Sequence, residues 1–228
     1  MASSRRAATA KVAHRGAPAL AVRAEPHDES LLHRLLFFSD AVFAIVLTLL
    51  VLELRPPEAH GPEALRAALA GMGGHFVAFA MTFTVIGIFW AAHMNTLRAL
   101  RRFDWPTALV NLVFLFPICL LPFVTGLMAE ARFEALAWTI YSWVLIAASA
   151  ANVALVLTLW RGKGRLTGGA SPGLALYRVS RAAAPGLAFG AGLGALALGR
   201  LDLARFCWLL IPALFLASRL LLAPKRPA

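Results

Sequence analysis

The chain contains six apolar segments, each long enough to form a helix of about 20 residues that crosses the hydrocarbon core of a bilayer. The segments cover about 35–54, 75–94, 107–128, 136–159, 179–198 and 203–222. Hydrophobic residues make up 60% of the 228 residues and charged residues only 14%, whereas soluble domains are about 45–50% apolar and about 25% charged. A bilayer is the solvent that fits this composition. The sequence therefore predicts an all-α membrane protein with six transmembrane helices.

The basic residues are distributed unevenly about these segments, and their distribution predicts the orientation of the chain. Of the 22 lysines and arginines, 17 fall on the side of the predicted membrane that holds both termini. The other five are Arg55, Arg66, Arg132, Arg200 and Arg205. Cytoplasmic loops carry an excess of Lys and Arg, so both termini are expected in the cytoplasm, as an even number of spans requires. The same distribution explains the net charge of +11 without a nucleic-acid partner.

The apolar segments divide the chain into three parts. Residues 1–30 are expected to form a cytoplasmic N-terminal tail, residues 31–223 the transmembrane domain, and residues 224–228 a cytoplasmic C-terminal end. The expected location is the cell membrane, with the lipid bilayer as the surrounding partner. Cys119 and Cys207 lie inside apolar segments, so they are expected as buried thiols rather than as a disulfide or a metal site. No cofactor is expected.

The first apolar segment carries an acidic residue and a stripe of side chains at helical spacing. With about 100° of rotation per residue, six residues fall on one side of the helix. The stripe consists of Ile45, Thr48, Leu49 and Leu52, extended toward the cytoplasm by Phe38 and Ala41. Asp40 falls on the far side, about 140° from Ile45. Because acids inside a span usually face protein or water, Asp40 is expected to hold the helix to its neighbours. By spacing alone, such a stripe is more often a core or lipid-facing surface.

Residues 34–40, at the start of this first segment, have the pattern R-x-x-x-F-S-D. They resemble the signature of the transmembrane protein 175 family of potassium channels. Residues 89–93 resemble the family's W-x-x-H at the end of its second helix, and residues 111–115 and 121–123 resemble its third helix. The resemblance covers about residues 31–130, and beyond them only the number of predicted spans agrees.

The resemblance implies a homotetramer of six-helix subunits, in which four copies of the first helix surround a central pore for potassium ions. Carried over to this sequence, Ile45, Leu49 and Leu52 would form hydrophobic constrictions, and Thr48 would add a ring of hydroxyls. Apolar rings can gate a pore by dewetting. They would also favour potassium, because sodium holds its water more tightly and loses more on entering. The pattern occurs once in the chain, which implies the single-repeat bacterial type.

In the family, the signature residues form a network with the second and third helices. The resemblance therefore assigns support of the pore helix to six residues. They are Arg34, Phe38, Ser39, Asp40, Trp90 and His93. The potassium-filter sequence T-V-G-Y-G is absent from the chain, so selection by rings of backbone carbonyls is not available.

The sequence leaves a proton channel of the same fold and a secondary transporter as alternatives. Some members of the family conduct protons, and Asp40 and His93 are titratable. A transporter would normally show internal repeats or broken helices, whereas the chain has no repeated half and no Gly or Pro inside the first segment. An intramembrane enzyme needs a nucleophile and base, or metal ligands, within its spans. Only His75 and His93 lie in or near a span, so no enzymatic activity is expected.

Overall fold

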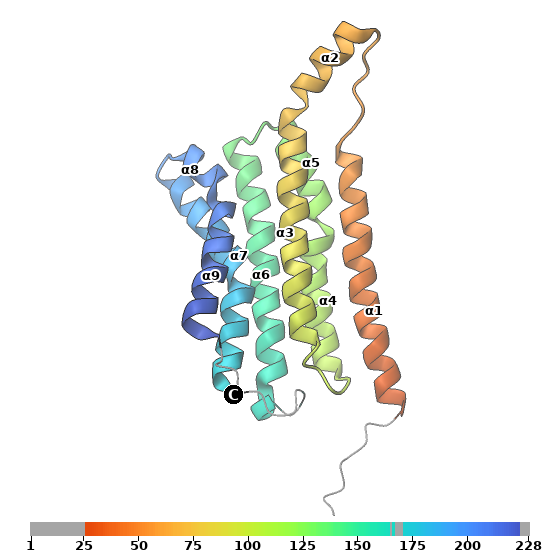
Figure 1. The fold of residues 1–228 in the computed structure, drawn as a ribbon, viewed down its shortest axis with the longest axis vertical. Coiled ribbons are helices and arrows are strands. Elements are labelled where there is room, and N and C mark those ends of the chain that lie inside the picture. Colours follow the sequence, from red (N-terminus) through yellow and green to blue (C-terminus); the bar gives the residue numbers. More distant parts are fainter. Residues whose placement is uncertain (1–25, 165, 167–170, 224–228) are drawn as a thin grey trace, which may run out of the picture.

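The structure is a computed structural model that describes residues 26–164, 166 and 171–223, and these residues form helices joined by short connections (Figure 1). The elements are α1 (Pro26–Leu49), η1 (Leu50–Glu53), α2 (Pro62–Gly71), α3 (Gly73–Leu97), α4 (Trp105–Cys119), α5 (Leu121–Glu130), α6 (Ala135–Gly164), α7 (Pro172–Ala197), α8 (Leu201–Arg205), η2 (Cys207–Leu209) and α9 (Leu210–Leu222). The predicted all-α class is confirmed for the described residues. α1 begins at Pro26, before the predicted boundary at residue 31. The remainder of the predicted N-terminal tail and the predicted C-terminal end lie outside the described residues.

Four helices of the described chain are long and apolar enough to cross a membrane. They are Glu29–Glu53, Gly73–Leu97, Trp105–Glu130 and Ala135–Arg161, and they coincide with the first four predicted spans. The predicted fifth span lies in α7, whose apolar part is mostly Ala and Gly. The predicted sixth lies in a shorter apolar helix, Cys207–Leu222. The count of six spans therefore stays a prediction.

The third span departs from the single helix that its length suggested. α4 begins with Asp104 as its N-cap, whose carboxylate accepts a hydrogen bond of 3.0 Å from the backbone nitrogen of Thr107. The span then breaks at Leu120, between Pro117 near the end of α4 and Pro122 near the start of α5. Each proline removes a backbone donor and its ring crowds the preceding turn, so the helical ladder is interrupted between them.

The first span also changes geometry toward its end. The α-helix gives way at Leu50 to the 3₁₀ turn η1, which ends at Glu53. The chain then passes Pro56 and Pro57, which cannot continue the helix, and leads to α2. This short helix has no buried residue and projects beyond the bundle (Figure 1).

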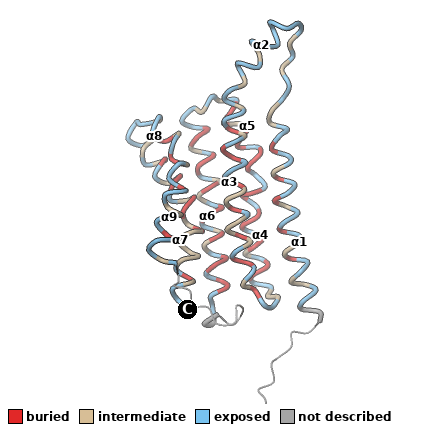
Figure 2. Tube along the Cα trace, viewed as in Figure 1, coloured by how far each residue is buried: buried red, intermediate tan, exposed pale blue. Residues whose placement is uncertain are grey.

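α1 forms one edge of the bundle and α8 and α9 the opposite edge, with α3 to α7 between them (Figure 1). α1 is in contact with α3, α4 and α5. Burial is concentrated in the central helices, and along α1 it is confined to one side (Figure 2). The largest buried side chains of the core are Phe43, Phe89, Phe114, Trp138, Tyr141 and Phe189. Of the two cysteines, Cys207 is buried as predicted, whereas Cys119 is exposed, because it lies on the outward face of α4 at the break.

α6 and α7 are joined through a hydroxyl that is inserted into the backbone ladder of α7. The Ser149 hydroxyl donates to the carbonyl oxygen of Ala182 at 2.6 Å and accepts from the backbone nitrogen of Gly186 at 2.9 Å. It thereby bridges the two backbone groups that would otherwise pair beside Pro185. Gly186 allows this approach, because a Cβ there would lie 2.7 Å from the Cβ of Ser149.

We expect Gly186→Ala to destabilise the protein by about 1–3 kcal/mol, because the added methyl group overlaps Ser149 and separates α6 from α7. Gly190→Ala is the matched control, since nothing lies within 4 Å of a Cβ at that position of the same helix. The melting temperature in detergent, followed by tryptophan fluorescence, should fall for the first variant and stay near that of the parent for the second. Equal melting temperatures would show that the inserted hydroxyl does not fix the spacing of the two helices.

Candidate functional site: the first helix and its anchors

α1 has one buried face and one exposed face. Buried residues recur every third or fourth position, at Leu35, Ser39, Phe43, Val46 and Leu50. This spacing places them along one side of an α-helix. That side faces α3, α4 and α5.

The opposite face of α1 is the predicted stripe, and the described part of the chain leaves it uncovered. All six stripe residues are exposed. Ile45 is 56% exposed, Leu49 44% and Leu52 64%. Among them Thr48 is the one polar residue, and its hydroxyl donates to the carbonyl oxygen of Ile45 at 2.8 Å. Because this bond uses the hydroxyl hydrogen, the oxygen lone pairs are left to accept from water or to face a cation.

A chain of buried hydrogen bonds holds the other face of α1 to α3 and α4. The Nε2 atom of His93 lies 2.7 Å from Oδ1 of Asn111. The amide nitrogen of Asn111 donates to the Ser39 hydroxyl at 2.9 Å, and that hydroxyl donates to the carbonyl oxygen of Leu35 at 2.9 Å. An amide oxygen can only accept, so Nε2 of His93 carries the proton in this arrangement. Each hydrogen bond of this series, from His93 through Asn111 to Ser39, is therefore donated in the direction of α1.

Aromatic rings enclose this polar chain. The ring of His93 stacks on Phe114, with centroids 5.1 Å apart and an interplanar angle of 16°, and lies 5.6 Å from the ring of Phe43. Ser39, His93 and Asn111 are all buried. In such an environment each hydrogen bond is stronger than in water, and an unpaired group is costly. The network therefore fixes the position of α1 and its rotation about its own axis.

Asp40 makes a second, more exposed contact with α3. One of its carboxylate oxygens accepts a hydrogen bond of 3.0 Å from the indole nitrogen of Trp90. This contact joins α1 to α3, and the anchoring role of Asp40 stays a prediction. Within the described chain Arg34 is exposed and has no hydrogen bond or ion pair, and Phe38 lies on the exposed stripe. The structure thus brings together four of the six predicted anchor residues and leaves Arg34 and Phe38 apart.

Asn111 is the central residue of the anchor and was not singled out from the sequence. It is 0% exposed and contacts both His93 and Ser39. The available signal was an amide side chain in the middle of an apolar span, where a polar group needs partners.

A second buried cluster was also missed. The hydroxyl oxygens of Thr82 and Tyr141 lie 2.9 Å apart, as do those of Thr125 and Thr82, which joins α3, α5 and α6.

Charged side chains line a cavity of about 280 Å³ beside the C-terminal end of the first span. The cavity is lined by Glu53, Arg55, His75 and Glu130 among others. His75 and Glu130 approach to 3.8 Å, and a Cβ at Gly126 would overlap the carboxylate of Glu53. Across residues 26–164, 166 and 171–223, no group of three or more His, Cys, Asp or Glu side chains is placed to hold a metal ion.

The fold and these contacts define a helical membrane protein whose first helix is fixed on one side by a polar network and presents an apolar stripe on the other. Residues 34–122 match the model of the family described as endosomal/lysosomal potassium channel TMEM175. The matched segment contains most of α1, all of α3 and α4, and Ser39, Asp40, Trp90, His93 and Asn111. Over this segment the chain is similar to the TMEM175 family.

Individual relatives give the extent of the similarity. The chain is 36% identical over 122 residues to a potassium channel of Streptomyces collinus. The aligned residues cover 52% of this chain and 59% of that relative. It is 33% identical over 98 residues to the endosomal/lysosomal proton channel TMEM175 of Danio rerio, which covers 42% of this chain and 19% of that protein. The matched stretches thus span little more than half of the bacterial relative and less of the animal one.

A solved structure extends the similarity beyond the family segment. The crystal structure of a lysosomal potassium-selective channel TMEM175 homolog from Chamaesiphon minutus superposes with a TM-score of 0.66 at 25% identity. The superposition covers 83% of this chain and 98% of that chain. The similarity in fold therefore includes helices C-terminal to residue 122.

We expect Asn111→Ala to lower stability by about 2–4 kcal/mol, because it leaves both His93 and Ser39 without their buried partner. Asn95→Ala is the matched control, since the Asn95 amide is exposed and bonds only the carbonyl oxygen of Ala91 in its own helix. Thermal unfolding in detergent should separate the two variants. If both unfold at the parent temperature, the buried chain of hydrogen bonds does not hold α1.

Proposed function

We propose that four copies of this chain assemble in the cell membrane around a central pore, lined by α1, that conducts potassium ions passively. The observation that carries the proposal is the exposed apolar stripe on α1, which lies opposite a face fixed by a buried polar network. The bacterial relatives named potassium channels and the structural similarity to a potassium-selective channel support the same function.

In this assembly Ile45, Leu49 and Leu52 would form stacked apolar rings around the axis. Such rings can exclude water when the helices approach closely, which closes the pore without a moving plug. An ion that passes them loses part of its hydration shell, and the loss is larger for sodium than for potassium. The Thr48 hydroxyl oxygens lie between two of these rings and would offer partial compensation, because their hydrogens are already donated to Ile45.

The orientation proposed for the subunit places both termini in the cytoplasm, with α7 and α9 as the fifth and sixth spans. The excess of Lys and Arg at the end of the bundle where α1 begins supports this orientation. α2 would then project on the outer side, near the cavity lined by Glu53 and Glu130.

Proton conduction is the second candidate, because the animal relatives are named proton channels. Asp40 is the observation that favours it, because this carboxylate is exposed on α1. In the potassium channel that we propose, Asp40 serves only as a hydrogen-bond acceptor for Trp90. The two candidates therefore assign different roles to one side chain.

We expect Ile45→Asn to raise single-channel conductance and to lower the potassium-over-sodium permeability ratio severalfold, because an amide ring is easier to wet than an apolar one. The measurement is planar-bilayer recording under bi-ionic potassium and sodium conditions. Thr48→Ala should lower the same ratio with a smaller effect on conductance, since only the hydroxyl oxygens are removed.

Leu109→Asn in α4 is the control for Ile45→Asn. Leu109 is 59% exposed in the subunit, close to the 56% of Ile45, but α4 does not line the proposed pore. If the α1 stripe only faced lipid, the two substitutions would act alike. Unchanged permeability in Ile45→Asn, or equal changes in both variants, would remove α1 from the pore.

We expect Asp40→Asn to keep potassium current near that of the parent, because an asparagine oxygen can still accept the indole hydrogen of Trp90. Asp40→Ala lacks this acceptor and should lower the yield of assembled protein on size-exclusion chromatography. A proton current that is present in the parent and lost in Asp40→Asn, while the protein remains assembled, would favour proton conduction through Asp40.

A further inference from the structure

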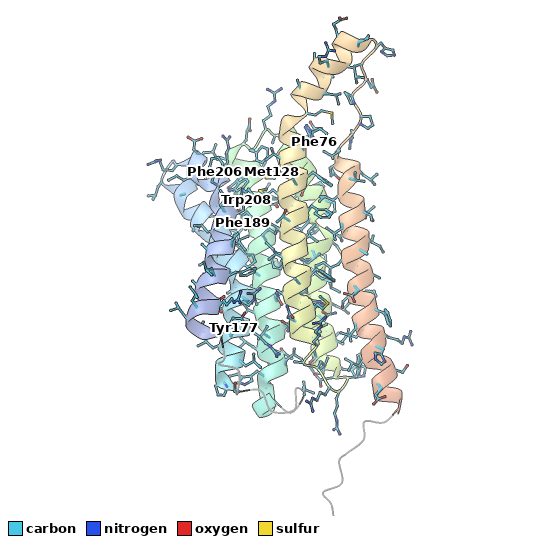
Figure 3. The ribbon with its side chains drawn as sticks, viewed as in Figure 1. Phe76, Met128, Tyr177, Phe189, Phe206 and Trp208 are labelled. Atoms are coloured by element: carbon cyan, nitrogen blue, oxygen red, sulfur yellow. The ribbon has the colours of Figure 1, made fainter. Side chains whose placement is uncertain are left out.

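A basic cavity of about 410 Å³ lies between α3, α7 and α9 and is lined by no residue of α1. Three of its lining residues are arginines, namely Arg178 and Arg181 from α7 and Arg219 from α9. Tyr177, which also lines it, marks its level in the lower part of α7 (Figure 3). α7 and α9 are in contact, so the arginines of the two helices face a common space.

These arginines have no carboxylate partner within the described part of the chain. The ion pairs found there are His75 with Glu130 and Arg205 with Asp202. The sequence explains this, because Asp202 is the only acidic residue after Glu134. Asp202 lies in α8, at the opposite end of the bundle from Tyr177 (Figures 1 and 3). The cavity therefore gathers positive charge that no side chain from these helices neutralises.

One of the three arginines is held in place by its surroundings. The guanidinium of Arg181 lies 4.3 Å from the ring centroid of Phe215, and one of its nitrogens is 3.5 Å from the Tyr177 hydroxyl. Stacking on an aromatic ring leaves the edge of the guanidinium available for hydrogen bonds. Arg178 is half-buried and Arg219 lies in the last turn of α9. The guanidinium groups of three arginines, each with several N–H donors, thus line a space large enough for a phosphate group.

Apolar side chains accompany the arginines. Leu174 and Ala182 line the cavity beside them, and Leu220, which follows Arg219 on α9, is 75% exposed. A free anion would gain nothing from these leucines, whereas acyl chains attached to a bound headgroup would lie against them. Basic pockets between membrane helices on the cytoplasmic side are suited to anionic lipid headgroups.

We propose that this cavity binds the phosphate of an anionic phospholipid from the cytoplasmic leaflet. The choice of leaflet rests on the orientation under the proposed function, but the binding itself does not require ion conduction. Arg181 provides the fixed donor, and Arg178 of α7 and Arg219 of α9 donate further hydrogen bonds to the phosphate. Bound lipid would tie the end of α9 to α7.

The test uses the purified full chain in a zwitterionic detergent. Phosphatidylglycerol, phosphatidylcholine and inorganic phosphate are titrated separately, with bound lipid counted by native mass spectrometry and stability followed by melting temperature. Phosphatidylglycerol should bind and raise the melting temperature, and phosphatidylcholine and inorganic phosphate should do so much less. Arg178→Gln and Arg219→Gln should each weaken phosphatidylglycerol binding about fivefold. Arg161→Gln is the charge-matched control, since Arg161 is exposed on α6 and does not line the cavity.

Two results would overturn the site, and neither depends on potassium flux. Equal weakening by Arg161→Gln would mean that net charge, rather than the cavity, attracts the lipid. If inorganic phosphate bound as tightly as phosphatidylglycerol and needed the same arginines, the ligand of the cavity would be a free anion and not a lipid.

Because Arg219 is exposed, its substitution leaves the core intact and keeps the comparison valid if Arg178→Gln fails to fold. Loss of channel activity with lipid binding retained would count against the proposed function alone.

Discussion

The hydrogen bonds from His93 through Asn111 to Ser39 are the contact on which the arrangement of α1 depends. α1 is at the edge of the bundle and buries only one narrow face. Apolar packing gives little resistance to rotation of such a helix in lipid, since the tails are as apolar as the leucines. A directional chain of donors that ends on the backbone of α1 does resist rotation. The polar network on the buried face of α1 therefore determines which residues lie on its exposed face.

The sequence predicts a helix well when the apolar length and periodicity of its own segment are sufficient to define it. The first four spans and the separation of Asp40 from the stripe follow from apolar length and helical periodicity. Periodicity defines the stripe on α1, but its pore-facing role was implied only by the family resemblance. The break at Leu120 could have been anticipated from Pro117 and Pro122, but in membrane helices proline often only kinks the chain. α7 remained ambiguous because Ala and Gly are compatible both with a span and with a tightly packed soluble helix.

The anchor could be predicted only in part, because partners depend on which helices are neighbours. Ser39, Asp40, Trp90 and His93 were found through the family resemblance, and they do lie together. Asn111 links three of the helices, and nothing in its own span indicates which hydroxyl or imidazole it meets. The exposure of Cys119 has the same origin, since the face of α4 that points outward is decided by α1 and α6. Side-chain pairing across helices is tertiary information.

The change from α-helix to 3₁₀ turn at Leu50 alters the alignment of the last two rings in the proposed pore. An α-helix places a residue about 60° short of a full turn after three steps, whereas a 3₁₀ turn brings it back to the same direction. The rise over those three residues is also larger, about 6 Å instead of about 4.5 Å. Leu52 therefore stands above Leu49 instead of beside it. In a tetramer this would give an ion two coaxial barriers with a resting position between them, rather than one continuous apolar wall.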